Sequence, residues 1–328
     1  MRSHGSFSLL ALSLVVFSLS TTAAFSAKLS PNFYGKTCPG ALATIKSAVD
    51  AELMRQQRMG ASLLRLFFHD CFVQTCDGSN LLDPAPNIDS EKNATPNAFS
   101  VRGYDVIDRI RLELDKTCGG PVVSCADIVA VAARDSVVAL GGPSWEVELG
   151  RRDSLNGNST LADINIPSPF MNLTQLIANF KNQGLDVQDL VALSGGHTIG
   201  LTHCGFFQNR IYNETSATID PAFARLRKEH CLPTATLAAI LELAPLDSTP
   251  RQFDTNYFSN LVQKKGLLDS DQALYLGGVT DGLVKRYSTN REAFFKDFAR
   301  SMVKMGNFKP LTGNEGQIRN NCRKVNPY

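Results

Sequence analysis

The stretch GASLLRLFFHDC, residues 60–71, sets a permanent cation and a histidine four positions apart in an apolar run. If this segment is a helix, Arg65 and His69 share one face and project into the same space. That pairing suits cleavage of a bond that loses a proton at one end and sheds negative charge at the other, with His69 as general base and Arg65 stabilising the developing anion. Because an unpartnered buried guanidinium is costly, we expect Arg65 to face a cavity with an anionic group. A histidine that merely packs or caps a helix end is the alternative interpretation.

A second histidine, His197, closes the apolar stretch DLVALSGGHTIG, residues 189–200. The chain has five histidines, and His4 lies in an N-terminal leader. His203 and His230 sit beside cysteines, so we expect them to be surface or packing residues. A metal-dependent hydrolase would need more histidines than the two motifs supply.

The segment DCFVQTCDGS, residues 70–79, follows His69 directly. Oxygen-bearing positions alternate along it, which in an extended loop points them to one side. Two carboxylates, a hydroxyl and main-chain carbonyls would make an all-oxygen calcium site, and a disulfide between the segment's two cysteines would close the loop. The candidate ligands are Asp70, Val73, Thr75, Asp77 and Ser79. A solvated acidic turn is the alternative.

The first 27 residues have the features of a secretory signal peptide: Arg2, an apolar run over residues 8–16, and small residues at 22–27. The apolar run is too short to span a bilayer. We expect cleavage within residues 24–27, which leaves residues 28–328 as one domain with a substantial core. No later run is long and apolar enough to be transmembrane.

All eight cysteines lie after the leader, and an even number in a secreted chain predicts four disulfides. Zinc binding is the alternative, but no CxxC pair occurs. Sequons at Asn93, Asn158, Asn172 and Asn213 also indicate export, although Pro96 weakens the first. Lysine plus arginine number 33 against 31 acidic residues, without clustering, so no nucleic-acid or anionic-membrane surface is expected. The partner is expected to be a small molecule.

Helix punctuation recurs along the chain, and alternating strand patterns are scarce. Five residues are expected to open helices: Ser124, Asn172, Asp186, Asp220 and Asn290. The expected stops are residues 141–143, Gly184, Leu193 and Gly306, and a further helix is expected from Asp254 to Gly266. The sequence therefore predicts one mainly α-helical domain without repeats or linkers.

These motifs closely resemble the secreted plant haem peroxidases, class III of the plant peroxidase superfamily. Matching segments run from LSPNFY at 29–34 to NCRKVN at 321–326, so the resemblance covers nearly the whole mature chain. Residues 60–71 resemble the family's distal signature and residues 189–200 its proximal haem-ligand signature. The resemblance implies two helical lobes that sandwich one haem b, with two calcium ions.

The same resemblance implies roles for single residues. His197 matches the axial iron ligand, and Asp271 matches the acceptor of a hydrogen bond from its other ring nitrogen. Asn97 matches the asparagine whose carbonyl oxygen holds the distal histidine. Phe68 stands where intracellular relatives carry tryptophan, and Pro167 matches a proline whose carbonyl contacts phenolic substrates.

Further family features follow residue by residue. Asp127 and Arg151 match a buried ion pair. The implied disulfides are Cys38 with Cys118, Cys71 with Cys76, Cys125 with Cys322, and Cys204 with Cys231. The second calcium site would use Thr198, Asp247, Thr249, the Gln252 carbonyl and Asp254.

Several positions depart from the family pattern. Thr75 replaces the usual glycine of the distal calcium loop, where only the main-chain carbonyl is a ligand, and Asn80 replaces an aliphatic residue. The spacing between Asp247 and Thr249 is one residue shorter than usual. We therefore expect the second calcium site to bind more weakly than the first.

The implied function is reduction of hydrogen peroxide with oxidation of phenolic or similar small aromatic donors by one-electron steps. A catalytically silent secreted glycoprotein that uses the fold for binding is the alternative. A serine hydrolase is weaker, because Ser194 lacks a GxSxG elbow. The chain ends soon after Cys322, without the long tail expected of vacuolar relatives, which favours export to the cell-wall space. A monomer is expected.

Overall fold

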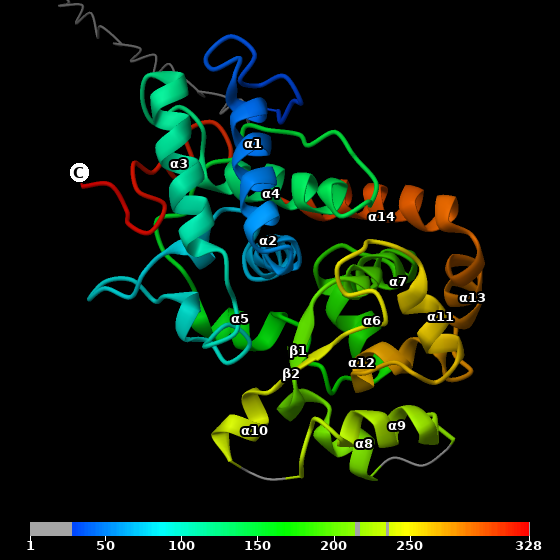
Figure 1. The fold of residues 1–328 in the computed structure, drawn as a ribbon. Coiled ribbons are helices and arrows are strands. Elements are labelled where there is room, and N and C mark those ends of the chain that lie inside the picture. Colours follow the sequence, from blue (N-terminus) through cyan, green and yellow to red (C-terminus); the bar gives the residue numbers. More distant parts are fainter. Residues whose placement is uncertain (1–27, 214–216, 234–235, 328) are drawn as a thin grey trace, which may run out of the picture.

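The computed structural model describes residues 28–213, 217–233 and 236–327, and the expected leader, residues 1–27, lies outside them. The fold is mainly helical, as the sequence predicts (Figure 1). The first part of the chain forms α1 (Ala41–Arg55), α2 (Arg58–Cys71), η1 (Ser79–Leu81), η2 (Glu91–Asn93), α3 (Tyr104–Cys118), α4 (Cys125–Ala139) and α5 (Ser159–Asn165).

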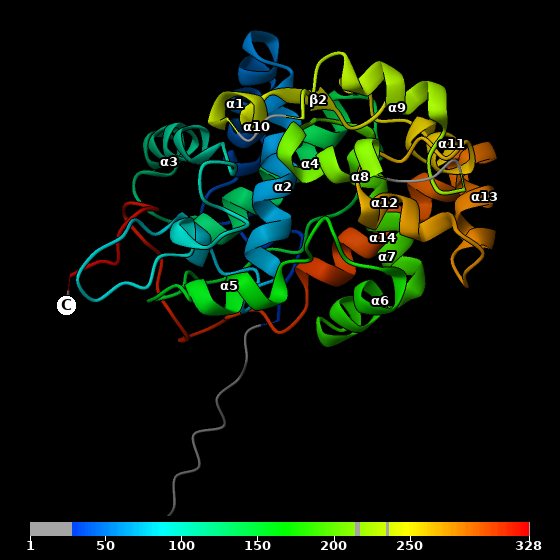
Figure 2. The same cartoon turned by 90° about the horizontal axis from the view of Figure 1, so that it is seen from below.

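The middle of the chain forms α6 (Leu173–Asn182), α7 (Val187–Ser194), η3 (Gly195–Thr198), β1 (Leu201–His203), η4 (Cys204–Phe206), α8 (Gln208–Asn213), α9 (Pro221–Lys228), α10 (Leu237–Leu241) and β2 (Leu243–Pro245). The last part forms α11 (Asn256–Val262), α12 (Asp269–Gln272), η5 (Ala273–Tyr275), α13 (Asp281–Thr289) and α14 (Arg291–Gly306). Figure 2 shows the same elements from below.

Helix α4 is the central helix of a first group formed by α1–α4. The Ser124 hydroxyl caps its first turn by accepting a hydrogen bond from the Asp127 N–H at 3.1 Å. Nearly all of its residues are buried, because it packs against both α1 and α2. Helix α2, which carries Arg65 and His69, is therefore fixed against a rigid, buried neighbour.

The second group, α7 with α11–α14, surrounds an aromatic core. Helix α7 packs against α14, and α11 packs against α13. Between them, rings from Phe253, Phe258, Tyr287, Phe294 and Phe298 meet mostly edge to face, with centroids 4.8 to 5.8 Å apart. This core supports the segment that ends in His197.

The helix caps at Asn172, Asp186, Asp220 and Asn290 occur as the sequence predicts. The helix expected from Asp254 to Gly266 differs: α11 begins at Asn256 and ends at Val262. Asp254 lies two residues before α11, and its carboxylate accepts from the Asn256 N–H at 2.8 Å as well as from the hydroxyls of Thr198 and Thr249. At the other end, Lys264 has φ of +57°, which turns the chain out of the helix.

The two short strands β1 and β2 pair antiparallel, with Leu201 opposite Pro245. All eight cysteines form disulfides with the pairing that the resemblance implies, so the zinc alternative is wrong. In the described part of the chain, no helix is both long and apolar enough to cross a bilayer.

Candidate active site

A cavity separates α2 from the segment formed by α7 and η3. Arg65, Phe68 and His69 line it on the α2 side, and His197 lines the opposite side. The two histidine motifs, more than 100 residues apart in sequence, therefore face one space. Pro167 also lines this cavity.

His69 is oriented by Asn97. Its Nδ1 lies 2.6 Å from the Asn97 Oδ1, and the Asn97 Nδ2 donates to the Glu91 carbonyl at 2.8 Å. Because the amide nitrogen is engaged by that carbonyl, the amide oxygen must accept from the His69 Nδ1–H. The Nε2 of His69 is thereby left as the proton-accepting nitrogen.

Burial, with the positive charge of Arg65, holds the pKa of His69 well below its ordinary value of 6.5, although the Asn97 bond acts in the opposite direction. Burial also lowers the pKa of Arg65, to about 10, so the guanidinium stays charged at neutral pH. The cavity therefore holds a neutral base beside a cation.

Arg65 is held in place by two uncharged partners. Its Nη2 donates to the Pro96 carbonyl at 2.8 Å and to the Ser100 hydroxyl at 3.2 Å. These bonds hold the guanidinium in place at the cavity lining. The Phe68 ring stacks on Phe72 at 4.0 Å between centroids, which fixes the apolar part of the same wall.

His197 lies in the turn η3 after α7. Its Nδ1 lies 2.8 Å from the Asp271 Oδ1, and the other Asp271 oxygen accepts from the Leu268 N–H at 3.3 Å. The turn fits because Gly195 packs closely: a Cβ there would lie 2.5 Å from the Phe294 ring. With Nδ1 donating to Asp271, the Nε2 lone pair of His197 is available to a metal ion.

The acidic loop after α2 folds as a compact turn. Asp70 accepts from the Gly78 N–H at 2.9 Å, and Asp77 accepts from the Ser79 N–H at 3.0 Å. The Ser79 hydroxyl is fully buried without a hydrogen-bond partner in the described part of the chain. An orphaned hydroxyl beside two buried carboxylates suits a calcium ion.

Val73 and Thr75 are the other two candidate calcium ligands of the loop. The Val73 carbonyl accepts from the Asn165 side chain at 3.0 Å, which uses one of its two lone pairs. The Thr75 hydroxyl donates to the Phe308 carbonyl at 2.9 Å. The side chain that replaces glycine is therefore accommodated by a bond to Phe308.

Both carboxylates of the acidic loop have raised pKa values. Burial, with the charge of Asp77, raises the pKa of Asp70 well above its ordinary value, and burial raises the pKa of Asp77 to about 6. A bound divalent cation would favour the ionised form of both groups.

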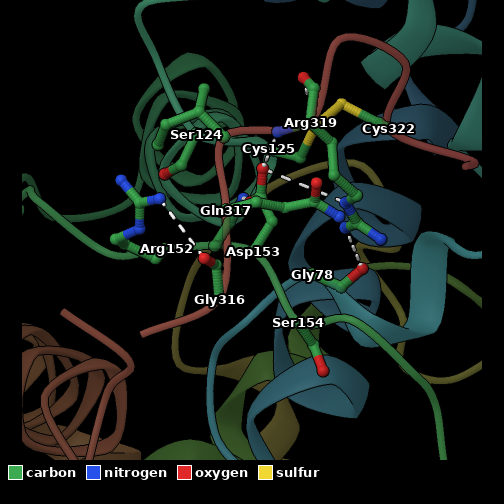
Figure 3. Close-up of polar contacts among 12 residues, drawn as sticks. Gly78, Ser124, Cys125, Arg152, Asp153, Ser154, Gly316, Gln317, Arg319 and Cys322 are labelled. Carbon is green, nitrogen blue, oxygen red and sulfur yellow. Dashed lines mark hydrogen bonds and ion pairs between the residues drawn. A yellow bond between two sulfur atoms is a disulfide. The ribbon is translucent and has the colours of Figure 1, made fainter. Parts of the chain in front are cut away.

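Arg319 supplies a fixed positive charge behind this loop. Figure 3 shows its guanidinium reaching the Gly78 carbonyl, while its backbone N–H donates to the Asp153 Oδ2 at 2.8 Å. The charge of Arg319 lowers the pKa of both Asp70 and Asp77, so it opposes the effect of burial. The adjacent Cys125 to Cys322 disulfide ties this C-terminal segment to α4.

A second oxygen cluster lies next to His197. The Thr198 hydroxyl lies 3.1 Å from carboxylate oxygens of both Asp247 and Asp254, and the Thr249 hydroxyl lies 2.9 Å from Asp254. Gln252 is connected to this cluster by its backbone N–H, which donates to the Thr249 carbonyl at 2.9 Å. Burial, with the charge of Asp254, raises the pKa of Asp247 to about 6.

Glu91 and His203 are among the residues of this region to which the sequence motifs give no role. Glu91 is fully buried, its carbonyl holds Asn97, and burial with the charges of Asp70 and Asp77 raises its pKa well above the ordinary value. Its position next to an exposed sequon gave no sign of that burial. His203, expected at the surface or in packing, lines the cavity, and its Nδ1 donates to the Leu241 carbonyl at 2.8 Å.

The expected Asp127 to Arg151 ion pair forms at 2.9 Å and is buried, away from the cavity lining. Asp127 also accepts from the Tyr34 hydroxyl at 2.8 Å and from the Gly150 N–H at 2.7 Å. This pair therefore belongs to the scaffold.

Comparisons with known proteins identify chains of similar sequence. Residues 45–290 match a family model described as peroxidase. The chain is 53% identical over 319 residues to Peroxidase 4 of Vitis vinifera, covering 96% of this chain and 98% of that protein. It is 54% identical over 304 residues to Peroxidase RIP1 of Medicago truncatula and 52% identical over 301 residues to the lignin-forming anionic peroxidase of Nicotiana sylvestris, with 92% of each chain covered.

Proposed function

This chain belongs to the class III plant peroxidases, enzymes that reduce hydrogen peroxide with electrons from a reductant, and we propose that it binds haem b between His197 and His69. The Nε2 of His197 would hold the iron. The hydrogen bond to Asp271 makes this imidazole a stronger electron donor. Bound haem would supply the iron on which peroxide is cleaved and the electrons for that cleavage.

The residues on the α2 side would move the proton. His69 accepts a proton from one oxygen of hydrogen peroxide through Nε2 and delivers it to the other oxygen, which leaves as water. Arg65 stabilises the negative charge that develops on the leaving oxygen. Asn97 keeps the correct nitrogen of His69 free, and Phe68 keeps this side of the cavity apolar.

The reductant would be a small aromatic molecule such as a phenol, and two such molecules would each give up one electron in successive steps. Pro167 lies in the cavity wall, where its carbonyl can accept a hydrogen bond from a phenolic hydroxyl. The relative from Nicotiana sylvestris is named as lignin-forming, which is in keeping with such donors.

Two calcium ions would brace the two sides of the cavity. The first would be held by the loop of Asp70, Val73, Thr75, Asp77 and Ser79, and the second by Thr198, Asp247, Thr249, Gln252 and Asp254. Each group adjoins a functional histidine, since Asp70 follows His69 and Thr198 follows His197.

The mature enzyme would comprise residues 28–328 as one haem peroxidase domain, released by cleavage within residues 24–27. We propose that it acts outside the cell, in the wall space, as a monomeric glycoprotein. The sequon asparagines 93, 172 and 213 have exposed side chains, which supports glycan attachment there.

The observation that carries the proposal is the pair of oriented histidines facing one cavity. A binding-only protein would need neither orientation, and the comparisons favour the enzyme. Stopped-flow mixing with hydrogen peroxide tests it: a His69→Ala variant should react about 10² to 10⁴ times more slowly than wild type. His230→Ala, at an exposed histidine, is the control and should react normally. A His69→Ala variant as fast as wild type would refute the assignment.

A further inference from the structure

One oxygen of Asp271 has two hydrogen-bond partners. The His197 Nδ1 lies 2.8 Å from the Asp271 Oδ1, and the Tyr257 hydroxyl lies 3.0 Å from the same atom. Nothing in the sequence motifs marks Tyr257, which belongs to α11 and lies fourteen positions before Asp271. The imidazole and the phenol therefore share a single acceptor.

The direction of the second bond is fixed by chemistry. An ionised carboxylate has no proton to give, so the Tyr257 hydroxyl is the donor. Tyr257 is only 2% exposed, so its phenol donates to Asp271 from inside the protein.

The geometry around Tyr257 holds this donor in place. Its ring meets the Phe258 ring edge to face at 5.0 Å between centroids, and it meets the His197 imidazole edge to face at 6.1 Å. The opposite oxygen of Asp271 is held by the Leu268 N–H. The carboxylate can therefore neither turn away from Tyr257 nor give His197 an unshared oxygen.

We propose that Tyr257 is a positioning residue that limits how strongly Asp271 polarises His197. A carboxylate oxygen that accepts two hydrogen bonds has less negative charge to offer each donor, so the Nδ1 proton of His197 is pulled less strongly. This inference rests on the proposed role of His197 as iron ligand. In this arrangement Asp271 makes the imidazole of His197 electron-donating, and Tyr257 moderates that effect.

Loss of the Tyr257 hydroxyl should lower the reduction potential of the iron. Without the phenolic hydroxyl, the Asp271 to His197 bond strengthens, the imidazole donates more strongly to iron, and the ferric state is favoured over the ferrous state. The equilibrium constant for one-electron reduction should fall on the order of two- to tenfold, the equivalent of one hydrogen bond. The iron–histidine stretching frequency of the ferrous enzyme should rise.

The test uses Tyr257→Phe in the purified haem-loaded enzyme, with redox titration and resonance Raman spectroscopy as readouts. Tyr287→Phe is the matched control, because Tyr287 is also buried, donates to a carboxylate, Asp297, at 2.7 Å, and packs on Phe258. Both variants lose a buried tyrosine–aspartate bond. Only Tyr257→Phe should lower the reduction potential and raise the stretching frequency.

Three results would overturn the inference: wild-type potential and frequency in Tyr257→Phe, the same shifts in Tyr287→Phe, or loss of haem from Tyr257→Phe alone, which would mean a purely structural role. The wild-type Raman spectrum separates this failure from failure of the proposed function. A wild-type enzyme without an iron–imidazole stretch would count against His197 as ligand. A normal wild-type stretch with an unshifted variant would count against Tyr257 only.

Discussion

The Nδ1 of His69 lies 2.6 Å from the Oδ1 of Asn97, and the same asparagine donates its amide hydrogen to the Glu91 carbonyl. This chain of two bonds fixes which nitrogen of His69 is free to take a proton. It also connects the base to η2, whose Glu91 side chain lies under the influence of the acidic loop. The 3-10 helix η2 therefore supplies the backbone carbonyl that orients Asn97 and, through it, the base.

Replacing Asn97 with valine should slow the reaction with hydrogen peroxide about ten- to hundredfold, because the His69 Nδ1–H loses its acceptor in a buried site. The rate constant is measured by stopped flow. Asn179→Val is the control, since Asn179 is likewise buried and donates to a carbonyl, that of Asn165, at 2.8 Å. Equal rates for the Asn97 variant and wild type would contradict the orienting role.

The peroxide rate constant should remain flat as pH falls through 6.5, the ordinary histidine value, and drop only at more acid pH. The reason is that His69 has a lowered pKa and must be neutral to act as a base. Folding stability should also fall as pH falls. Below pH 6.5 the unfolded state binds a proton that folded His69 does not. A rate that already halves at pH 6.5 would contradict the lowered pKa of His69.

Removing calcium from the loop around Ser79 should lower both thermal stability and peroxide reactivity, since an ion bound only to the folded state stabilises that state by mass action. Ser79→Ala sharpens the test. In chelator the variant should be no less stable than wild type, because it loses only an orphaned hydroxyl. On adding calcium its melting temperature should rise less. A calcium-free wild type with full stability and activity would exclude this site.

The cluster around Thr198 should bind a second calcium ion more weakly than the first, because the loop from Asp247 to Thr249 is short. Its occupancy should decrease as pH falls through about 6, where Asp247 takes up a proton. Calcium titration of the stripped enzyme, followed by the haem spectrum, measures both effects. Two equally tight sites would contradict the weakening, and one site in total would mean that the short loop abolishes binding.

Breaking the buried ion pair by Arg151→Met should destabilise the fold by about 3–5 kcal/mol, because it leaves Asp127 buried without its cation. The peroxide rate constant of the folded variant should be unchanged. Lys46→Ala, which breaks an exposed pair with Asp50, should cost at most about 1 kcal/mol in the same urea titration. Comparable losses in the two variants would argue against a structural role for Arg151.

Local patterns were sufficient to predict the helical class and most helix starts. The caps at Ser124, Asn172 and Asn290 act within one turn of their own helix, so the sequence contains the whole interaction. Asp254 shows the limit of such reasoning. Its carboxylate also accepts from Thr198, 56 positions away, which local spacing could not predict, and α11 begins only at Asn256.

The residues of the candidate site likewise fall into those that local motifs predict and those whose role depends on the folded chain. His69 and His197 lie in motifs that predict their chemistry, and the family resemblance predicts the roles of Asn97 and Asp271. Glu91, Tyr257 and Arg319 lie outside these motifs, and what they do depends on contacts made in the folded chain. The guanidinium of Arg319 meets the Gly78 carbonyl from 241 positions away, a contact that no local pattern encodes.

The most direct test of the account is the visible absorption spectrum of the purified enzyme beside that of His197→Ala. The account predicts a Soret band in wild type, and loss of stable haem incorporation and peroxidase turnover in the variant, because the Nε2 of His197 is the proposed ligand of the iron. A native Soret band with full turnover in His197→Ala would contradict it.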